Sequence, residues 1–598
     1  MEGHVSRRAA GSAGGRYHEL IVVAVAALVF LGGVVSPPSL MDDVDAVQAQ
    51  IARTMLDSGD WVTATLNGVK YLEKSPLIYW MMAISYMLFG VHDWSARLPV
   101  ALSAVALCWL AFRMGAWAFS RRAGMFAGLI LATSTGLWLF TRIQIPDVTL
   151  TATMALALWS FLRALDPAEP RPGLWSTVMA AAIGTGLLLK GLIAAGFPVA
   201  AALLFLGFAG LLRSRETWRR LHVFRGVLVA LAIALPWHVL ATIRNPPYFD
   251  FTMVSEPGQY RGFFWFYFIN EHLLRFLNLR YPRDYNTVPR LYFWLFHLLW
   301  LFPWSAYFPA VAKLSFRPAD RASKMRLLCL CWAGFLLVFF TFSSTQEYYS
   351  MPCYPALALL LASAMDTPLT AVWRRRGELA LMGVTALAFA SIAFILSRVW
   401  TLPAPGDISR ALVQNPEAYT LSLGHMGDLT LASFAYLRTP LMVAGLAFSI
   451  GAIAARRASA AGVVVMMVLF VHAARMALVA FDPHLGSRRL AAALEGQPPG
   501  PLVLDNQYYA FSSVIFYTKK RPVLLLNGRV NNLEYGSNAS GAPGVFLDDT
   551  GFRELWSSAS PFYLCVEKPQ VERLEKLVGR EALHLVIESG GKFLFRNR

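Results

Sequence analysis

Charged residues are scarce in this chain: Asp, Glu, Lys and Arg make up 15% of its 598 residues. Soluble domains carry about 25% charged residues. The apolar residues, 56% of the total, are gathered into blocks of about 17–25 residues, the length that crosses the hydrocarbon core of a bilayer. The composition therefore excludes an ordinary soluble protein and predicts an α-helical polytopic membrane protein.

Cysteine is also scarce, with five in the chain. Cys108, Cys329, Cys331 and Cys353 lie in or beside apolar blocks, and Cys565 stands alone in the hydrophilic tail. No spacing among them is typical of a metal site or of a disulfide framework. The cysteines therefore predict neither a metal site nor disulfide bonds.

Acidic residues are few relative to basic ones, 36 against 53, which gives a net charge of +17. The basic residues gather in short segments between apolar blocks, and this is the pattern that holds cytoplasmic loops inside. No nucleic-acid-binding module accompanies the charge, so we expect no nucleic-acid partner. The basic segments lie at 121–122, 213–225, 313–326, 374–376 and 456–457.

Thirteen apolar blocks are candidate spans. With the N-terminus inside and one crossing at each block, every basic segment lies inside and the C-terminal tail lies outside. We keep the first block as an uncleaved span rather than a signal peptide, and we predict a membrane module over residues 1–481 with outer loops at 39–94 and 243–290. The blocks are 19–38, 95–112, 124–141, 148–164, 174–191, 193–212, 224–242, 291–311, 326–343, 351–367, 378–399, 431–454 and 460–481.

The tail, residues 482–598, differs from the rest of the chain. It alternates short β-type runs such as "PLVLD" and "PVLLLN" with helical ones such as "PQVERLEKLVG", which is typical of an α/β domain. Its 117 residues are enough to bury a core. We therefore predict a small C-terminal α/β domain on the outer side of the membrane.

The outer loops contain three further candidate helices. "DAVQAQIARTMLDSG" has apolar residues at helical spacing, and Gly59 is a stop signal. "PLIYWMMAISYMLFG" predicts an interfacial helix with Tyr79 and Trp80 at headgroup level. Segment 260–278 predicts a third.

Ionisable groups stand at the outer ends of several apolar blocks. A charge at membrane depth is costly and is therefore a functional candidate. The alternative for each is structural: a helix start for the aspartates, a surface ion pair for the Glu-Lys sequence, and a snorkelling side chain for the isolated lysine. These groups are Asp42, Asp43 and Asp45, then Glu73 and Lys74 in "YLEKSP", Arg142 and Asp147 in "RIQIPDVTL", and Lys190 in "GLLLKGLIAAGFP".

Two later outer segments mix basic, acidic and aromatic residues. Such a surface can bind a phosphorylated lipid headgroup, or it can rest on anionic lipid without further function. The tyrosines can equally be core or interface residues. The residues are Arg261, Glu271, His272, Arg275, Arg280, Tyr281 and Arg283 in the loop 243–290, and Gln346, Glu347, Tyr348 and Tyr349 in "SSTQEYYSMP".

A carboxylate with several cations outside the membrane points to one kind of reaction. No nucleotide pool exists there, so an activated donor has to arrive in the bilayer, as a sugar on polyprenyl phosphate does. Its leaving group is a stable anion and needs no acid, whereas glycosidases need two carboxyl groups in opposite roles. One carboxylate would take the proton of an acceptor hydroxyl, while lysine or arginine would bind the phosphate. No nucleotide or redox cofactor is expected.

The first outer loop, "DDVDAVQAQIARTMLDSGDWVTATLNGVKYLEKSPLIYW", resembles that of bacterial membrane glycosyltransferases related to aminoarabinose (lipid A) transferase and protein O-mannosyltransferases, the GT-C family. "PDVTL", "LLLKGLIAAGFP" and "INEHLLRFL" resemble later family features, and the resemblance covers about residues 20–365. It implies an inverting transfer from a polyprenyl-phosphate sugar to a lipid, glycan or protein hydroxyl. Gln48 replaces a family tyrosine and Ser75 a family proline, so the sugar and the acceptor do not carry over.

The resemblance also implies roles for single residues. Glu73 and Lys74 match a Glu-Lys pair implicated in metal and donor-phosphate binding, which admits a divalent metal ion as a cofactor. The family's Asp-Glu pair falls on Val44 and Asp45, with Asp43 displaced by one position; either aspartate can be the base, and we favour Asp43. We assign catalysis to Asp43, Asp45 and Asp147, and substrate binding to Tyr71, Glu73, Lys74, Lys190, Arg275, Tyr348 and Tyr349.

A transporter or flippase of a lipid-linked or anionic solute is the alternative. It would be expected to show midspan charges and broken helices in paired halves, whereas here most charges lie at one face and no internal repeat is visible. A sensor would need a cytoplasmic output module, and no inner loop is long enough.

Overall fold

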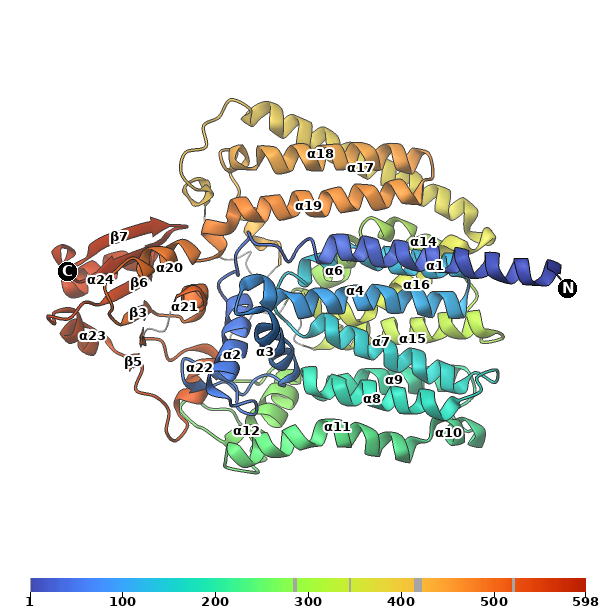
Figure 1. The fold of residues 1–598 in the computed structure, drawn as a ribbon, viewed down its shortest axis with the longest axis horizontal. Coiled ribbons are helices and arrows are strands. Elements are labelled where there is room, and N and C mark those ends of the chain that lie inside the picture. Colours follow the sequence, from blue (N-terminus) through green and yellow to red (C-terminus); the bar gives the residue numbers. More distant parts are fainter. Residues whose placement is uncertain (1, 283–287, 344–345, 414–421, 519–521) are drawn as a thin grey trace.

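The computed structural model describes residues 2–282, 288–343, 346–413, 422–518 and 522–598. Figure 1 shows a bundle of long helices with a sheet and its helices at one end, and the N-terminus at the opposite end. The predicted fold class, a helical membrane module with a small C-terminal α/β domain, is confirmed.

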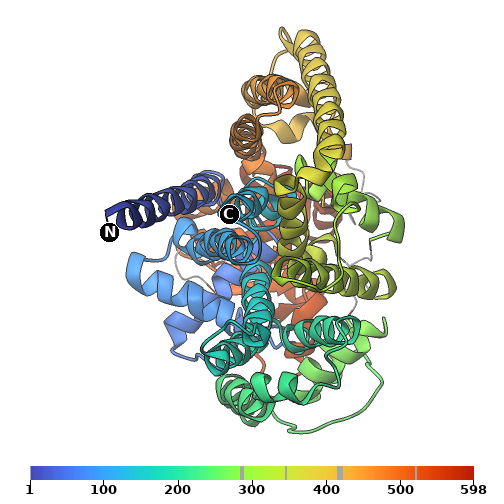
Figure 2. The ribbon, with the colours of Figure 1, turned by 90° about the vertical axis from the view of Figure 1, so that its right-hand side faces the viewer.

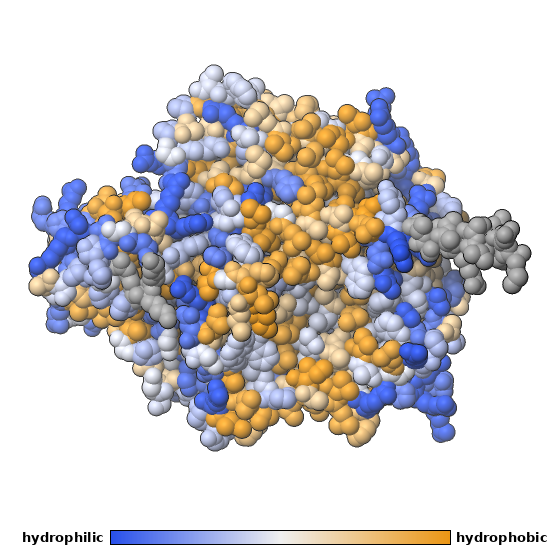
Figure 3. All heavy atoms as spheres, in the orientation of Figure 1, coloured by the Kyte–Doolittle hydropathy of each residue, from blue (hydrophilic) through white to orange (hydrophobic). Residues whose placement is uncertain are grey.

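Eight helical segments in the described part of the chain are long and apolar enough to cross a membrane, judged by length and composition. Figure 3 shows apolar side chains concentrated between two more hydrophilic ends, as expected for a multi-pass membrane protein. The segments are α4 (Asp93–Ala118), α7 (Asp147–Leu165), α8 (Pro172–Lys190), α10 and α11 (Arg215–Leu221 and Val223–Arg244), α15 (Arg321–Phe342), α17 (Ala371–Val399), α18 (Arg438–Arg456) and α19 (Ala460–Leu485).

Other predicted spans are shorter or broken. Block 193–212 forms the shorter helix α9 (Ile193–Phe208), and 19–38 forms the end of α1 (Glu2–Phe30). Block 124–141 forms α5 (Arg121–Ala132) and α6 (Thr135–Phe140), 291–311 forms α13 (Arg290–Trp300) and α14 (Phe308–Val311), and 351–367 forms a 3-10 turn and α16 (Tyr354–Asp366). Pro303 and Pro352 lie at two of these breaks, where proline removes a helical donor. The number of 13 crossings therefore stays a prediction.

The end-on view in Figure 2 shows that the helices do not form one ring. Helices α17, α18 and α19 project at one edge, and α11 lies at the opposite edge (Figures 1 and 2). Helices α4 and α7 between them are the most buried spans, and α17 is the least buried. The centre of the bundle is therefore built on the helices that follow the first outer loop.

The first outer loop forms α2 (Val44–Ser58), a hairpin of β1 (Thr65–Leu66) and β2 (Val69–Lys70), and α3 (Leu77–Phe89). Helix α2 buries its apolar face and ends at Gly59, which has φ of 73° and donates its N–H to the carbonyl of Met55, as predicted. The expected interfacial position of Tyr79 is wrong, because that side chain is fully buried. Trp80 is partly buried and donates to the carbonyl of Trp61 at 2.8 Å.

The third predicted loop helix is present but irregular. It begins as α12 (Gly262–Phe264) and continues as a π-helix over Trp265–Leu274. π-Helical turns are rare and occur frequently at functional sites. This segment carries Glu271, and Arg275 follows it directly.

The C-terminal sheet has six strands in the order β5–β4–β3–β6–β8–β7. The first four in this order are parallel, and β8 is antiparallel to both neighbours. The predicted boundary at residue 482 lies in the last turn of α19, and this division stays a prediction. The strands are β3 (Leu502–Asp505), β4 (Val523–Leu526), β5 (Phe546–Leu547), β6 (Tyr563–Glu567), β7 (His584–Ser589) and β8 (Lys592–Arg596). The helices are α20 (Arg488–Glu495), α21 (Ser512–Tyr517), α22 (Asn531–Ser537), α23 (Asp549–Trp556) and α24 (Val571–Val578).

This sheet region packs on the first outer loop. Asn67 of the hairpin donates to the carbonyl of Val523 at 3.1 Å, and Arg53 of α2 to that of Phe516 at 2.9 Å. A Cβ at Gly536 in α22 would overlap the carbonyl oxygen of Lys70, so only glycine permits this approach. Segments that follow β3 and β4 therefore meet the loop that follows the first span (Figure 1).

Candidate active site

Glu73 lies between β2 and α3, at the junction of the membrane module and the sheet. Its carboxylate accepts hydrogen bonds from Lys74 Nζ at 2.5 Å, from the Tyr71 hydroxyl at 2.9 Å and from Asn532 Nδ2 at 2.5 Å. Burial opposes its ionisation, but the Lys74 ammonium and two nearby guanidinium groups outweigh burial and hold the pKa of Glu73 well below its ordinary value. Glu73 is therefore an anion that fixes cations around it, and it is not a surface residue.

Two arginines share a second buried carboxylate, Glu271. Arg275 donates to one oxygen of Glu271 at 2.6 Å, and Arg280 Nε donates to the other. Arg275 also lies 3.8 Å from Glu73 and donates to the Tyr349 hydroxyl at 3.0 Å. The outer loop 243–290 thus supplies two guanidinium groups directly to the Glu73 region.

Lys190, at the end of α8, lies on the same side. Its Nζ forms a 2.6 Å ion pair with Asp147, the first residue of α7, and lies 5.3 and 4.7 Å from the ring centroids of Tyr348 and Tyr349. Because Tyr349 also contacts Arg275, these groups join the region around Glu73. The structure therefore brings together eight predicted site residues, Tyr71, Glu73, Lys74, Asp147, Lys190, Arg275, Tyr348 and Tyr349. We call these eight residues, with Glu271 and Arg280 added, the charged cluster.

The charged cluster contains four cations and three carboxylates. Each carboxylate contacts at least one cation, so the cations are held in place before any ligand arrives. Cationic donors arranged in this way bind phosphate oxygens and stabilise negative charge that develops on them. The arrangement suits a phosphate that enters from the membrane side.

The three aspartates after the first span have different surroundings. Asp42 accepts from Lys592 Nζ and Ser487 Oγ, both at 2.5 Å, and from the Ser513 amide at 2.8 Å. These contacts attach the first loop to the C-terminal sheet. Asp42 therefore has a structural role: it holds the first outer loop against the C-terminal region.

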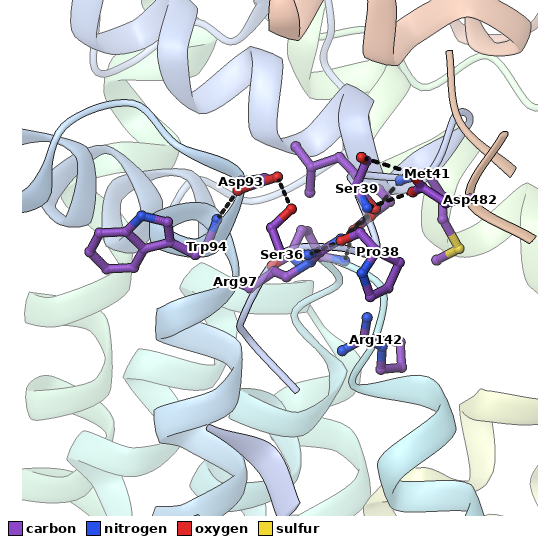
Figure 4. Close-up of polar contacts among 12 residues, drawn as sticks. Ser36, Pro38, Ser39, Met41, Asp93, Trp94, Arg97, Arg142 and Asp482 are labelled. Atoms are coloured by element: carbon purple, nitrogen blue, oxygen red, sulfur yellow. Dashed lines mark hydrogen bonds and ion pairs between the residues drawn. The ribbon is translucent and has the colours of Figure 1, made fainter. Parts of the chain in front are cut away.

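Asp45 is 2% exposed and belongs to a network beside the cluster. It accepts from the amides of Met41 at 2.9 Å and Gln144 at 3.2 Å, and Arg97 lies 3.8 Å away. Burial raises the pKa of Asp45 against the lowering effect of Arg97 and Arg142. Figure 4 shows the part of this network around Arg97, which donates to the carbonyls of the segment that leaves the first span, those of Pro38 at 2.7 Å and Ser39 at 2.6 Å.

Asp43 differs from Asp42 and Asp45 because it is exposed to solvent. It precedes α2 with φ of 72° and ψ of −146°, a conformation that costs a non-glycine residue about 1–3 kcal/mol and that gathers at functional sites. Its amide donates to the carbonyl of Tyr509 at 2.8 Å, and the Tyr509 hydroxyl lies 3.1 Å from that of Tyr71. Tyr509 therefore links Asp43 to the charged cluster.

Two contributions from the C-terminal region have no signal in the sequence. Asn532 of α22 is buried, donates to Glu73 at 2.5 Å and accepts from Arg280 at 2.7 Å. Tyr509 contacts Tyr71, as described above. Glu271 and Arg280 were named within the loop 243–290, but their contact with each other and with the Glu73 region depends on the π-helical fold.

The other candidate site residues of the outer loops do not belong to the charged cluster and have other partners. Arg261 pairs with Asp250 at 3.0 Å. His272 contacts the carbonyl of Tyr267 at 2.6 Å, and burial lowers its pKa to about 4, so it is neutral at physiological pH. Glu347 accepts from the amide of Ser422 at 3.2 Å. Arg283 lies outside the described residues.

A metal ion at Glu73 would have to fit the donors around that carboxylate. Within the described residues there is no group of three His, Cys, Asp or Glu side chains that could hold a metal ion. The Glu73 oxygens already accept from an ammonium, a hydroxyl and an amide. These residues do not fit a divalent cation at Glu73, and no step below uses one.

Known proteins match both the sequence and the fold. Residues 73–239 match the family described as dolichyl-phosphate-mannose-protein mannosyltransferase. The undecaprenyl phosphate-alpha-4-amino-4-deoxy-L-arabinose arabinosyl transferase of Pectobacterium carotovorum is 29% identical over 53% of this chain and 53% of its own length. That of Pseudomonas fluorescens is 30% identical over 63% and 61%. The chain thus spans about half the length of the first of these curated relatives.

The structural match extends over nearly the whole chain. The crystal structure of ArnT from Cupriavidus metallidurans bound to undecaprenyl phosphate superposes with a TM-score of 0.76 over 97% of this chain and 98% of ArnT, at 24% identity. The same protein in the apo state gives a TM-score of 0.74. At this identity the likeness shows the fold. In fold the chain is therefore similar to ArnT, and over part of its length its sequence is similar to the aminoarabinose and protein mannosyl transferases.

Proposed function

We propose that this protein is an inverting glycosyltransferase that moves a sugar from a polyprenyl-phosphate donor to a hydroxyl group of a lipid, glycan or protein. The observation that supports this most is the charged cluster, where Lys74, Lys190 and Arg275 converge beside the first outer loop. The names of the relatives support an undecaprenyl-phosphate donor with a pentose. Lipid A, the acceptor of the aminoarabinose transferases that the first outer loop resembles, is the acceptor to test first.

The proposed site faces the periplasm of the bacterial inner membrane. The first outer loop with α2 and α3, helix α12 and the C-terminal sheet lie at one end of the bundle, and the N-terminus and α10 lie at the other (Figure 1). Residues of the charged cluster belong to the first of these segments or follow α12. Helix α10 and the loop before it carry part of the basic residues that hold loops inside. We therefore infer that donor and acceptor meet on the outer side, where the donor remains anchored in the lipid.

The mechanism follows from the residues present. The acceptor hydroxyl gives its proton to the Asp43 carboxylate as its oxygen attacks the anomeric carbon of the donor. The bond between that carbon and the phosphate oxygen breaks on the opposite side, so the configuration inverts. Polyprenyl phosphate leaves as an anion, and Lys74, Lys190 and Arg275 stabilise its charge as it forms. Asp147 orients Lys190 through their ion pair.

The test uses two lysines of the same loop. Lys74 is in the charged cluster, whereas Lys70 is on the hairpin beside the Tyr260 ring. In proteoliposomes with undecaprenyl phosphate that carries radiolabelled 4-amino-4-deoxy-L-arabinose, and with lipid A, Lys74→Gln should transfer label at least 100-fold more slowly. Lys70→Gln should stay within threefold of the wild type. Equal rates in both variants would contradict the proposal, as would absence of wild-type transfer with arabinose, mannose and glucose donors.

A further inference from the structure

A pocket of about 400 Å³ opens between the outer loop 243–290 and helix α22. Its polar wall includes Arg280, Tyr281, Asn531 and Glu534, two from the membrane module and two from the C-terminal region. Nothing in the mechanism above uses Tyr281, Asn531 or Glu534. The pocket is large and polar enough to hold a small hydrophilic group.

The pocket and the charged cluster share Arg280. This residue is 3% exposed; it donates to Glu271 and, at 2.7 Å, to Asn532, which donates in turn to Glu73. The wall of the pocket therefore includes one of the four cations of the charged cluster. In a sugar phosphate the sugar is bonded to the phosphate oxygen, so it has to occupy space directly beside those cations.

Two other cavities fit a sugar less well. One is lined by Tyr71, Lys74 and mainly apolar side chains, but its volume of about 10 Å³ holds roughly one water molecule. Another, of about 310 Å³, lies beside Asp60, Lys70 and Arg244 and shares no side chain with the charged cluster. The pocket at Arg280 combines sufficient volume with contact to the cluster.

We propose that this pocket receives the sugar that is transferred and that Tyr281 and Glu534 select it; the proposal rests on the glycosyltransferase function. The Tyr281 hydroxyl donates to the two oxygens of Glu534 at 2.9 and 3.0 Å, which fixes the carboxylate. A carboxylate has about four acceptor positions, and in the described residues no cation pairs with Glu534. Its remaining positions can accept from hydroxyl or ammonium groups of a sugar.

In this arrangement Glu534 recognises the sugar and does not contact the lipid phosphate. A site built to hydrogen-bond a substrate rejects an analogue without the matching group. The donor that fits would have a hydroxyl or amino group placed to donate to the carboxylate. The C-terminal region would then determine which sugar is used, while the membrane module binds the phosphate.

The test separates sugar from phosphate with Glu534→Gln and Tyr281→Phe, and with Glu572→Gln as a matched control. Glu572 is an exposed residue of α24 that pairs with Lys576. The probes are undecaprenyl phosphate that carries 4-amino-4-deoxy-L-arabinose, the same lipid with mannose, and undecaprenyl phosphate without a sugar. For the preferred sugar-bearing donor, kcat/KM should fall 10- to 100-fold in Glu534→Gln and less in Tyr281→Phe. Inhibition by the sugar-free lipid should change less than twofold, and Glu572→Gln should behave as the wild type.

Each other outcome overturns the proposal. Equal weakening of sugar-bearing and sugar-free lipids would mean that the variant damages the phosphate site. A change in the KM of the acceptor alone would make the pocket an acceptor site, and no change would remove it from recognition. If the wild type transfers nothing, the proposed function fails; binding then decides the inference, because the wild type should still bind a sugar-bearing lipid more tightly than the sugar-free one, and Glu534→Gln should lose that difference.

Discussion

Two buried charge networks lie side by side on the first outer loop, and they differ in what their charges contact. Around Asp45 and Arg97, most hydrogen bonds end on backbone amides and carbonyls, and Figure 4 shows those of Arg97. Around Glu73 and Lys74, side chains from three separate segments bind one another, and cavities border the cations. The first network fixes the path of the chain, whereas the second, in our proposal, presents charge to a ligand.

The comparison separates two kinds of ionisable residue that look alike in the sequence. A buried charge with backbone partners is expensive to disturb, since removal of one partner leaves the other uncompensated. A cation held by a carboxylate beside a cavity can exchange part of its pairing for a phosphate. Substitutions in the first network should therefore change folding, and those in the second should change turnover.

Among the cations of the charged cluster, the largest effect on turnover is expected for Lys190→Gln. The variant loses a cation beside the leaving phosphate but keeps a side chain that can hydrogen-bond Asp147. Transfer in a single-turnover assay should slow about 100- to 1,000-fold, while the melting temperature stays within a few degrees of that of the wild type. A rate within threefold of the wild type would remove Lys190 from phosphate binding.

The largest effect on stability is expected for Arg97→Ala. It leaves Asp45 buried without its cation, which costs about 3–5 kcal/mol, so little monodisperse protein should be recovered after detergent extraction. Arg113→Ala is the matched control on α4. Its ion pair with Glu19 has the same length, 3.8 Å, but both side chains are partly exposed to solvent, so the substitution should change stability by about 0.5 kcal/mol or less. Normal yield and melting temperature in Arg97→Ala would contradict the distinction between the networks.

Asn532→Ala tests how far the second network extends into the C-terminal region. Loss of its bonds to Glu73 and Arg280 should misplace both groups and lower kcat about tenfold, with a smaller change in donor KM. Asn538→Ala, at the residue that follows α22, is the control, since within the described residues its side-chain amide donates only to the carbonyl of Glu534. An unchanged kcat in Asn532→Ala would confine the site to the membrane module.

A smaller effect is expected from pH, on the stability that the charge of Glu73 contributes. The pKa of Glu73 is lowered in the folded protein, so its charge contributes stability above its ordinary pKa of 4.5, and this contribution is lost as the pH falls toward the lowered value. The melting temperature of Glu73→Gln should therefore lie furthest below that of the wild type at pH 7 and approach it at pH 3. A gap that widens on acidification would contradict the assigned direction.

The sequence predicted the local parts of this site well. Glu73 and Lys74 are adjacent, and Lys190, Asp147 and Arg275 all occur where the chain reaches the same end of the bundle, so topology alone brings them near one another. Helix α2 and its end at Gly59 also followed from local pattern.

The remaining parts depend on contacts between distant segments. Asn532 is 459 residues from Glu73, and no periodicity marks an asparagine that will meet a carboxylate so far away. Tyr79 looked interfacial because its neighbours are apolar, yet it is fully buried, on a helix that packs against α2 and α4. The breaks in the spans near 303 and 352 depend on proline positions that hydropathy alone does not weigh.

The most direct test of the account compares Asp43→Asn with Asp45→Asn, with labelled sugar transfer and melting temperature measured on the same purified samples. We predict that Asp43→Asn keeps its melting temperature and loses about 100- to 10,000-fold in turnover, the range for a general base. Asp45→Asn should melt at a lower temperature and, per folded molecule, transfer sugar within about threefold of the wild type. A stable but inactive Asp45→Asn beside an active Asp43→Asn would contradict the account, because the base would then lie in the network that we assign to structure.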